Sequence, residues 1–258
     1  MRLTILGSTA GAPSRSNPAS GYLVQHGDVS IWMDAGTGTF MELAELVDPG
    51  TLDAVVISHT HVDHCSDLFG LYGYLAFGPS GDVPVKVFVP EGAADHLAAF
   101  ARATAEHIFN MVLDVLEVTP GDSVMVGDVG ISFGEAIHPV PALVTRIEAG
   151  GASLVYSGDT GPGGDLMEMA TGADVLLCEA SLDGIRNERT YPYHLTAIEA
   201  GETAAWGGVN RLIVTHIGAL MDPQQSLDEA AGAFAGRVGY AARGAVFEID
   251  GRSDGANG

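Results

Sequence analysis

The most informative stretch of the chain reads Ser58-His59-Thr60-His61-Val62-Asp63-His64. It begins where a near-continuous apolar run, Leu52–Ser58, ends, and such a run is typical of a strand buried on both faces. His59 and His61 alternate, so both rings can point the same way from an extended segment. Imidazole and carboxylate groups at this density suit a borderline-soft metal such as zinc. We therefore interpret the stretch as a metal-binding loop.

Length and composition fit one globular domain. The chain has 258 residues, of which 47% are hydrophobic, enough for a sizeable core. We expect a single domain over residues 1–250 and a disordered tail over residues 251–258, whose small and polar residues have nothing to bury. The apolar runs are far shorter than the roughly 20 residues of a membrane span, and the N-terminus enters a strand without a signal-peptide pattern. The two cysteines are too few for a disulfide scaffold, so we expect a cytoplasmic protein with no membrane partner.

The charge balance is strongly acidic. The chain has 11 Lys and Arg against 33 Asp and Glu, for a formal net charge of −22. Such a surface repels phosphate backbones, and proteins that bind nucleic acid usually carry a basic patch. A nucleic-acid partner is therefore not expected. A small anionic substrate remains compatible, because bound metal ions supply positive charge of their own.

The order of predicted elements indicates an α/β fold built from two β-rich halves. Helices are predicted at Ala93–Ile108, Thr196–Trp206 and Leu227–Phe234, the second with a capping-box pattern. The predicted strands are Leu3–Leu6, Gly21–Gln25, Val29–Asp34, Leu52–Ser58, Ser123–Val126, Val129–Phe133, Leu143–Glu148, Ser153–Ser157, Val175–Cys178, Leu212–Thr215 and Ala245–Ile249. Two packed sheets flanked by helices, an αββα sandwich, accommodate this order.

The spacing His-x-His-x-Asp-His resembles the metallo-β-lactamase superfamily, and further motifs of that family follow in order. His138 matches its third histidine, Asp159 its bridging aspartate, His216 its last histidine and Asp34 its early aspartate. The resemblance runs from about Leu3 to Phe247. It implies a four-layer αββα sandwich with two mixed β-sheets flanked by helices.

The resemblance also implies a dinuclear centre. His59, His61 and His138 would hold one metal ion, Asp63, His64 and His216 the other, and Asp159 would bridge both. Asp34 would orient a ligand without binding metal itself. Two zinc ions are expected, with manganese or iron as alternatives for the same nitrogen and oxygen ligands.

Within the superfamily, the chain is most similar to the ribonuclease Z-like phosphodiesterases. Gly7–Gly11 resembles their opening glycine loop, Cys178-Glu179-Ala180-Ser181 their His-Glu-Ala-Thr motif, and His194-Leu195-Thr196-Ala197 their His-Ser-Thr segment. This implies that His194 protonates the leaving oxygen, that Glu179 orients His194, and that Asp63 belongs to the catalytic residues as well as to the metal ligands.

Two departures narrow this resemblance. Cys178 stands where the motif has histidine, and Asp159 follows His138 by only 21 positions. Bacterial ribonuclease Z inserts a tRNA-gripping arm in that interval. The compact chain is more similar to cyclic-nucleotide phosphodiesterases and cyclic sugar phosphate hydrolases.

We therefore predict a dinuclear hydrolase that cleaves a small or cyclic phosphodiester, such as a cyclic nucleotide or cyclic sugar phosphate, with a hydroxide held between the metals. The alternatives are a ribonuclease Z-like tRNA 3′-processing endonuclease, an ester, thioester or lactone hydrolase, and a non-catalytic metal-binding protein. The family resemblance also implies a homodimer.

Two segments are candidates for substrate contacts. Arg186 and Arg189 precede His194 in a chain with few cations, so they either grip phosphate or belong to a solvated loop. The aromatic residues of a predicted loop at Leu68–Gly81 either stack on a base or pack into the core.

Overall fold

The computed structural model describes residues 1–78, 83–102 and 106–251. The tail predicted at 251–258 therefore lies, apart from Gly251, outside the described residues. No helix among the described residues is both long and apolar enough to cross a bilayer.

The first sheet has seven strands in the order β16-β1-β3-β4-β5-β6-β7. They are β16 (Val246–Glu248), β1 (Arg2–Gly7), β3 (Gly21–His26), β4 (Val29–Ala35), β5 (Ala54–Val56), β6 (Val85–Pro90) and β7 (Leu113–Val118). Strands β1, β3 and β4 pair antiparallel, and β4 to β7 pair parallel. β16 comes from near the end of the described chain and pairs with β1, so strands from both ends of the described chain lie side by side in this sheet.

The second sheet repeats this arrangement, in the order β15-β13-β12-β11-β10-β9-β8. Its strands are β15 (Arg237–Tyr240), β13 (Arg211–Thr215), β12 (Val175–Glu179), β11 (Ala152–Tyr156), β10 (Leu143–Ala149), β9 (Val129–Glu135) and β8 (Ser123–Val126). Strands β8 to β11 pair antiparallel, and β11, β12, β13 and β15 pair parallel. A short parallel pair, β2 (Thr9–Ala10) with β14 (Ile217–Gly218), links the two halves.

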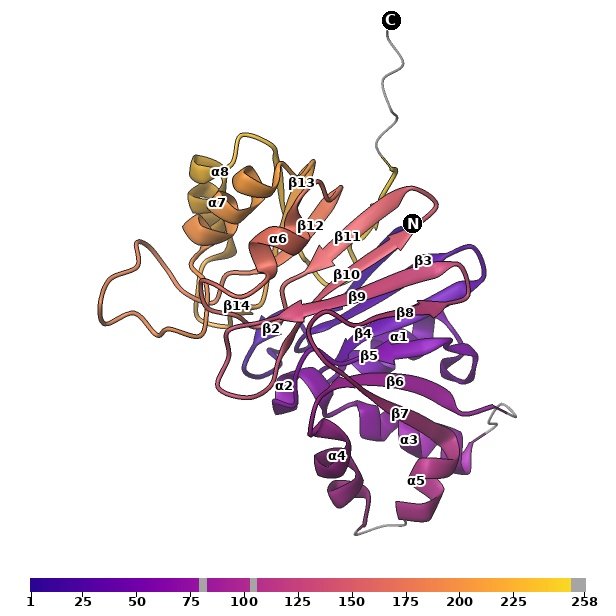
Figure 1. Cartoon of the computed structure of the whole chain (residues 1–258). Coiled ribbons are helices and arrows are strands. Elements are labelled where there is room, and N and C mark those ends of the chain that lie inside the picture. The colour runs from indigo at the N-terminus through magenta and orange to yellow at the C-terminus, as the bar shows by residue number, and fades with distance from the viewer. Residues whose placement is uncertain (79–82, 103–105, 252–258) are drawn as a thin grey trace, which may run out of the picture.

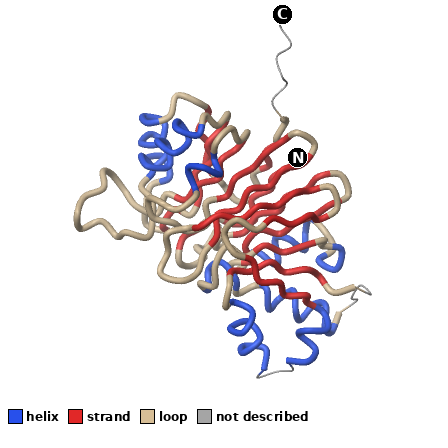
Figure 2. Tube along the Cα trace, in the orientation of Figure 1, coloured by secondary structure: helices blue, strands red, loops and turns tan. Residues whose placement is uncertain are grey.

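Helices cover the outer face of each sheet, as Figures 1 and 2 show. On the first sheet lie α1 (Thr39–Leu46), α3 (Leu68–Phe77), α4 (Ala93–Arg102) and α5 (Glu106–Val112), and on the second lie α6 (Leu166–Ala170), α7 (Ala197–Gly207) and α8 (Pro223–Ala233). Three apolar clusters fill the three interfaces: one between the sheets, and one between each sheet and its helices. The predicted αββα sandwich with two mixed sheets is confirmed.

Several local predictions were wrong. Leu68–Gly81 was predicted as a loop, but its first ten residues form α3, and residues 79–81 lie outside the described residues. Leu68, Leu71, Tyr72 and Leu75 are its buried residues, at helical spacing, but glycines and aromatics on the other positions leave no polar face to reveal the period. The helix predicted at Ala93–Ile108 is divided between α4 and α5, with residues 103–105 outside the described residues. Strands β6 and β7 and helix α1 were not predicted.

The packing between the sheets can be tested at Leu154, which lies on β11 and is fully buried. We expect Leu154→Ala to lower the free energy of unfolding by about 2–5 kcal/mol, because it leaves a cavity that the sheets cannot close. Leu220→Ala is the control, since Leu220 is fully exposed, and we expect it to change stability by less than about 0.5 kcal/mol. Urea unfolding measures both. Equal losses would contradict the assigned core.

Candidate metal centre

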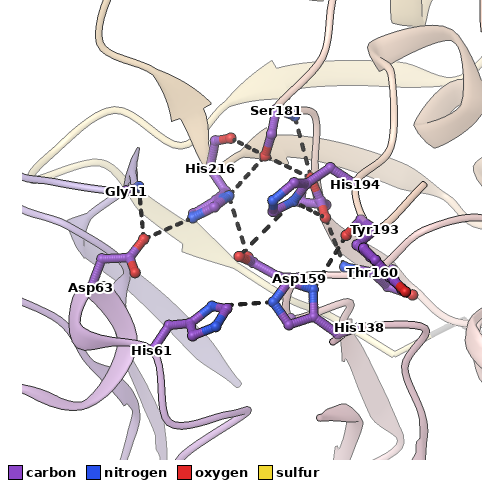
Figure 3. A network of polar contacts seen from close by, with 12 residues as sticks. Gly11, His61, Asp63, His138, Asp159, Thr160, Ser181, Tyr193, His194 and His216 are labelled. Atoms are coloured by element: carbon purple, nitrogen blue, oxygen red, sulfur yellow. Dashed lines mark hydrogen bonds and ion pairs between the residues drawn. The ribbon is translucent and has the colours of Figure 1, made fainter. Parts of the chain in front are cut away.

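The seven predicted ligands meet where strands of both sheets end. Figure 3 shows five of them, His61, Asp63, His138, Asp159 and His216. His59 and His61 follow β5, Asp63 and His64 lie on the short helix α2 (Val62–Cys65), His138 follows β9, Asp159 follows β11 and His216 follows β13. Two groups of these side chains bring their ligand atoms within 4.8 Å of one another: His59, His61, His138 and Asp159 in one, and Asp63, His64 and His216 in the other. A third such group joins Asp159 and His216 to His194.

In the first group, three imidazole nitrogens point at one spot. His61 Nδ1 lies 3.0 Å from His59 Nε2 and 3.2 Å from His138 Nε2. The other nitrogen of His138 lies 3.3 Å from the carbonyl oxygen of Tyr193, which can only accept, so it carries the proton and leaves Nε2 with a lone pair. Three imidazole nitrogens and the carboxylate of Asp159 thus converge within ligand distance of one point, so the group fits a metal ion.

The second group has the same character. His64 Nε2 lies 3.2 Å from His216 Nε2, which in turn lies 3.2 Å from Asp63 Oδ2. His64 Nδ1 donates to Asp34 at 2.7 Å, so Nε2 is the ring nitrogen that faces the site. Asp63 is held in place by the Gly11 amide, which donates to Oδ2 at 2.7 Å. The donor set therefore also fits a cation.

Asp159 faces both groups. Its Oδ1 lies 3.3 Å from His64 Nε2, and its Oδ2 lies 3.8 Å from His59 Nε2. The side chain is buried, yet Oδ1 has no hydrogen-bond partner among the described residues, a condition that proteins seldom leave uncompensated. Burial alone would raise the pKa of Asp159, but the charges of His216 and His64 outweigh it and hold this pKa well below its usual range. An ionised carboxylate that faces both ligand groups and has one oxygen without a hydrogen bond suits a bridge between two cations.

Asp34 supports the metal loop through hydrogen bonds. This fully buried carboxylate accepts four hydrogen bonds of 2.7–2.8 Å, from the Ser58 amide and hydroxyl, His64 Nδ1 and the Tyr156 hydroxyl. Burial raises the pKa of Tyr156 well above its ordinary value, so the hydroxyl remains a donor. Asp34 and His216 have φ angles of 52° and 50°, strained values for residues other than glycine that persist only where the surroundings over-determine them.

His194 lies at the edge of the ligand groups, as Figure 3 shows. Its Nδ1 lies 3.0 and 3.2 Å from the two oxygens of Glu179, which is fully buried and also accepts from the Thr160 amide and the Ser181 hydroxyl. Burial acts to lower the pKa of His194, but the hydrogen bond and charge of Glu179 outweigh it and raise this pKa above its usual value. The geometry thus places the His194 imidazole beside the predicted ligands, in hydrogen-bond contact with Glu179.

Four supporting groups were not predicted from the sequence. The hydroxyls of Ser58 and Tyr156 donate to Asp34. The Ser181 hydroxyl contacts Glu179 and His216, and the Gly11 amide donates to Asp63. Each lies in or beside a motif that the sequence made visible, but a hydroxyl or amide contact depends on the fold, and spacing alone does not reveal it. Ser181 is the most informative, because its hydroxyl lies 2.6 Å from Glu179 and 2.8 Å from His216 Nδ1 and so connects the partner of His194 to a predicted ligand.

The structure gives the two arginines predicted as substrate contacts different surroundings. Arg186 donates to protein acceptors, Glu199 and two backbone carbonyls, and its contact with a phosphate stays a prediction. Arg189 is exposed, and its role as a substrate contact stays a prediction. In α3, Phe69 and Tyr72 pack in the core between the first sheet and its helices, which favours the packing interpretation of these aromatics.

Comparisons with known proteins agree with this fold. The model of the beta-lactamase superfamily domain matches residues 29–217. An uncharacterized protein of Mycobacterium leprae is 35% identical over 254 residues, spanning 96% of this chain and 89% of the relative. A ribonuclease Z of Mycolicibacterium paratuberculosis is 30% identical over 264 residues, spanning 92% and 94%. Among solved structures, the chain is similar to the metallo-beta-lactamase fold protein YhfI from Bacillus subtilis, which is named "Probable metallo-hydrolase". The two align with a TM-score of 0.86 at 27% identity, over 96% of this chain and 99% of that chain.

Removing the carboxylate of Asp34 tests its supporting role. We expect Asp34→Ala to weaken zinc binding about 10–100-fold, because His64 loses the acceptor that sets its orientation and tautomer. The metal-free protein should also lose about 3–5 kcal/mol of unfolding free energy, since buried donors are left unpaired. Competition with a zinc-chelating dye and urea unfolding measure the two effects. Asp48→Ala, which removes a carboxylate that caps the 3-10 turn Pro49–Thr51, is the control for metal affinity, and equal zinc binding in both variants would refute the role of Asp34.

Proposed function

This chain belongs to the beta-lactamase superfamily as a ribonuclease Z-like metallo-hydrolase, and we propose that it cleaves small or cyclic phosphodiesters. The observation that carries the proposal is the pair His194 and Glu179. His194, the proposed acid, lies next to both ligand groups. Its ring stacks on that of His216 with the ring centroids 5.8 Å apart, and its centroid lies 5.5 Å from that of the His138 ring. A proton donor at this place serves a reaction whose leaving group is an alkoxide, as in phosphodiester cleavage.

The ligand side chains and the acid have separate tasks in the proposed reaction. When bound, two divalent cations supply a nucleophile from water at neutral pH and neutralise the charge that develops on the phosphoryl oxygens. The histidines and aspartates of the two groups bind and space these ions. Glu179 accepts a hydrogen bond from Nδ1 of His194. This contact stabilises the imidazolium until His194 gives a proton to the leaving oxygen. The resemblance implies zinc and a homodimer, and the low cysteine count favours the cytoplasm; all three are part of the proposal.

The connection between His138 and Asp159 supports a small substrate. Residues 139–158 contain a short loop, β10, a tight turn and β11, which pair as a hairpin. An arm that could grip tRNA has no place in this interval. The net charge of −22 further disfavours a long polyanion.

A ribonuclease is the second candidate, favoured by the relative named ribonuclease Z at 30% identity. A gel shift with precursor tRNA distinguishes it, since we expect no binding at physiological salt. Tight binding together with 3′ cleavage would replace the small-substrate proposal by the ribonuclease.

The number of bound ions tests the ligand groups. We expect the wild-type protein to retain two divalent ions per chain after dialysis, as a two-metal site does. His138→Ala and His216→Ala should each reduce this to about one, because each removes a ligand from one group only. His26→Ala, whose ring lies near Asp128 and outside all three groups, is the control. Elemental analysis of the dialysed proteins gives the counts, and two ions in both ligand variants would mean that the groups are assigned wrongly.

The role of His194 can be separated from folding by the choice of substrate. Bis-p-nitrophenyl phosphate releases a stable anion, whereas a 2′,3′-cyclic nucleotide releases a ribose alkoxide that needs a proton. We expect His194→Ala to slow the cyclic nucleotide about 10²–10⁴-fold, the usual contribution of a general acid, and to slow the p-nitrophenyl ester much less. Turnover rates measure both. Equal losses on the two substrates would remove His194 from the acid role.

A further inference from the structure

The segment that carries His194 has little regular structure of its own. Residues 180–196 connect β12 to α7 and extend away from the body of the molecule at the left of Figures 1 and 2. Ile185 is 82% exposed and Tyr191 is 51% exposed, so few apolar contacts hold the outer part. A proton donor must nevertheless stay within a fraction of an ångström of its working position. Ala180 and Leu195 near the ends of the segment pack in the core, but its outer part has to be fixed by contacts of another kind.

Arg186 provides fixed contacts inside the segment. Its guanidinium donates to both oxygens of Glu199, with Nη2 2.9 Å from Oε2, and to the carbonyl oxygens of Tyr191 (Nη1, 3.1 Å) and His194. The side chains are only 23% and 17% exposed. A bidentate, charge-assisted pair that is largely shielded from water is stronger than an ordinary surface ion pair. Arg186 thus joins its own part of the segment to the backbone of His194, the proposed acid.

Glu199 is itself fixed, because it belongs to the capping box of α7. Its Oε2 accepts from the Thr196 amide at 2.8 Å and from the Thr196 hydroxyl, while Thr196 accepts from the Glu199 amide. The contacts therefore run from the first turn of a packed helix through Glu199 and Arg186 to the main chain of His194. The ring of His194 is held separately by Glu179, so its backbone and its side chain have independent supports.

The backbone of the segment also packs closely against the chain that follows β11. A Cβ placed on Gly161 would lie 1.8 Å from the carbonyl oxygen of Pro192, so the two main chains are in direct contact. Gly161 lies two residues after Asp159, and Pro192 lies two residues before His194. The backbone of the acid is therefore seated against the strand end that supplies the bridging carboxylate.

We propose that Arg186 is a positioning residue that holds the segment Tyr191–His194 and thereby places the His194 acid beside the metal ligands. An arginine is needed because only a planar fork of donors can satisfy a carboxylate and two carbonyls together, whereas the ammonium of lysine is a point charge with three donors. The consequence for turnover rests on the proposed function, but the structural role does not.

The test compares Arg186→Met and Arg186→Lys with Arg146→Met. Arg146 is a matched control: it also donates to a glutamate, Glu148, and to two carbonyls, those of Met169 and Thr171, but it lies on β10 outside the ligand groups. Hydrogen exchange of the amides of residues 187–195 is the readout that needs no activity. We expect about 10-fold faster exchange or more in Arg186→Met, because local opening becomes easier, a smaller increase in Arg186→Lys, and none in Arg146→Met.

Turnover is the second readout. Arg186→Met should slow the 2′,3′-cyclic nucleotide about 10–100-fold, part of the general-acid contribution, and bis-p-nitrophenyl phosphate less than about 3-fold. The double variant with His194→Ala should be no slower than His194→Ala alone, because both changes act through one group. Should Arg186→Met fail to fold, Arg186→Lys carries the same comparison.

The outcomes separate the two proposals. Unchanged exchange in residues 187–195, or equal loss on both substrates, overturns the positioning role of Arg186. If the wild-type protein cleaves neither substrate, the proposed function fails, and exchange alone then decides the role of Arg186: faster exchange supports it, and unchanged exchange refutes it.

Discussion

The hydrogen bonds to the buried carboxylate of Asp34 are the constraint on which the rest of the site depends. A charge removed from water is costly unless it is fully paired, and Asp34 is paired by groups from three parts of the chain. Ser58 follows β5 just before the metal loop, His64 lies on α2 and Tyr156 belongs to the second sheet. The requirement to satisfy one carboxylate therefore fixes the metal loop and the two sheets relative to one another. The nearby bond between the hydroxyls of Tyr22 and Thr215, at 2.7 Å, joins the same two sheets.

This constraint explains why a strained backbone persists at the centre. Asp34 and His216 adopt left-handed φ angles that would cost stability in an isolated peptide. Gly36 shows how closely the chain is packed there, since a Cβ at this position would lie 2.0 Å from the carbonyl oxygen of Asp63. The ligands are thus held in a converging arrangement by the protein itself, as preorganised sites require.

Much of the fold was predictable because strand endings and metal ligands coincide in the sequence. Buried runs such as Val175–Cys178 and the cluster His59–His64 are local signals, and the order of the isolated ligands follows the order of the strands. What could not be predicted depends on tertiary context. Helix α3 lacks a polar face, and strands β6 and β7 lie beside helices with a similar apolar content. The pairing of Arg186 with Glu199, 13 residues away, has no local signal in the sequence. In a chain with 11 basic residues, this arginine is used inside the protein rather than toward solvent.

The central claim is that seven side chains hold two cations with one shared carboxylate. Anomalous diffraction at the zinc absorption edge from crystals of the zinc-loaded protein tests it most directly. The account predicts two peaks about 3.5–4 Å apart, one among His59, His61 and His138 and the other among Asp63, His64 and His216, with Asp159 between them. A single peak at saturating zinc, or peaks away from these side chains, would contradict it.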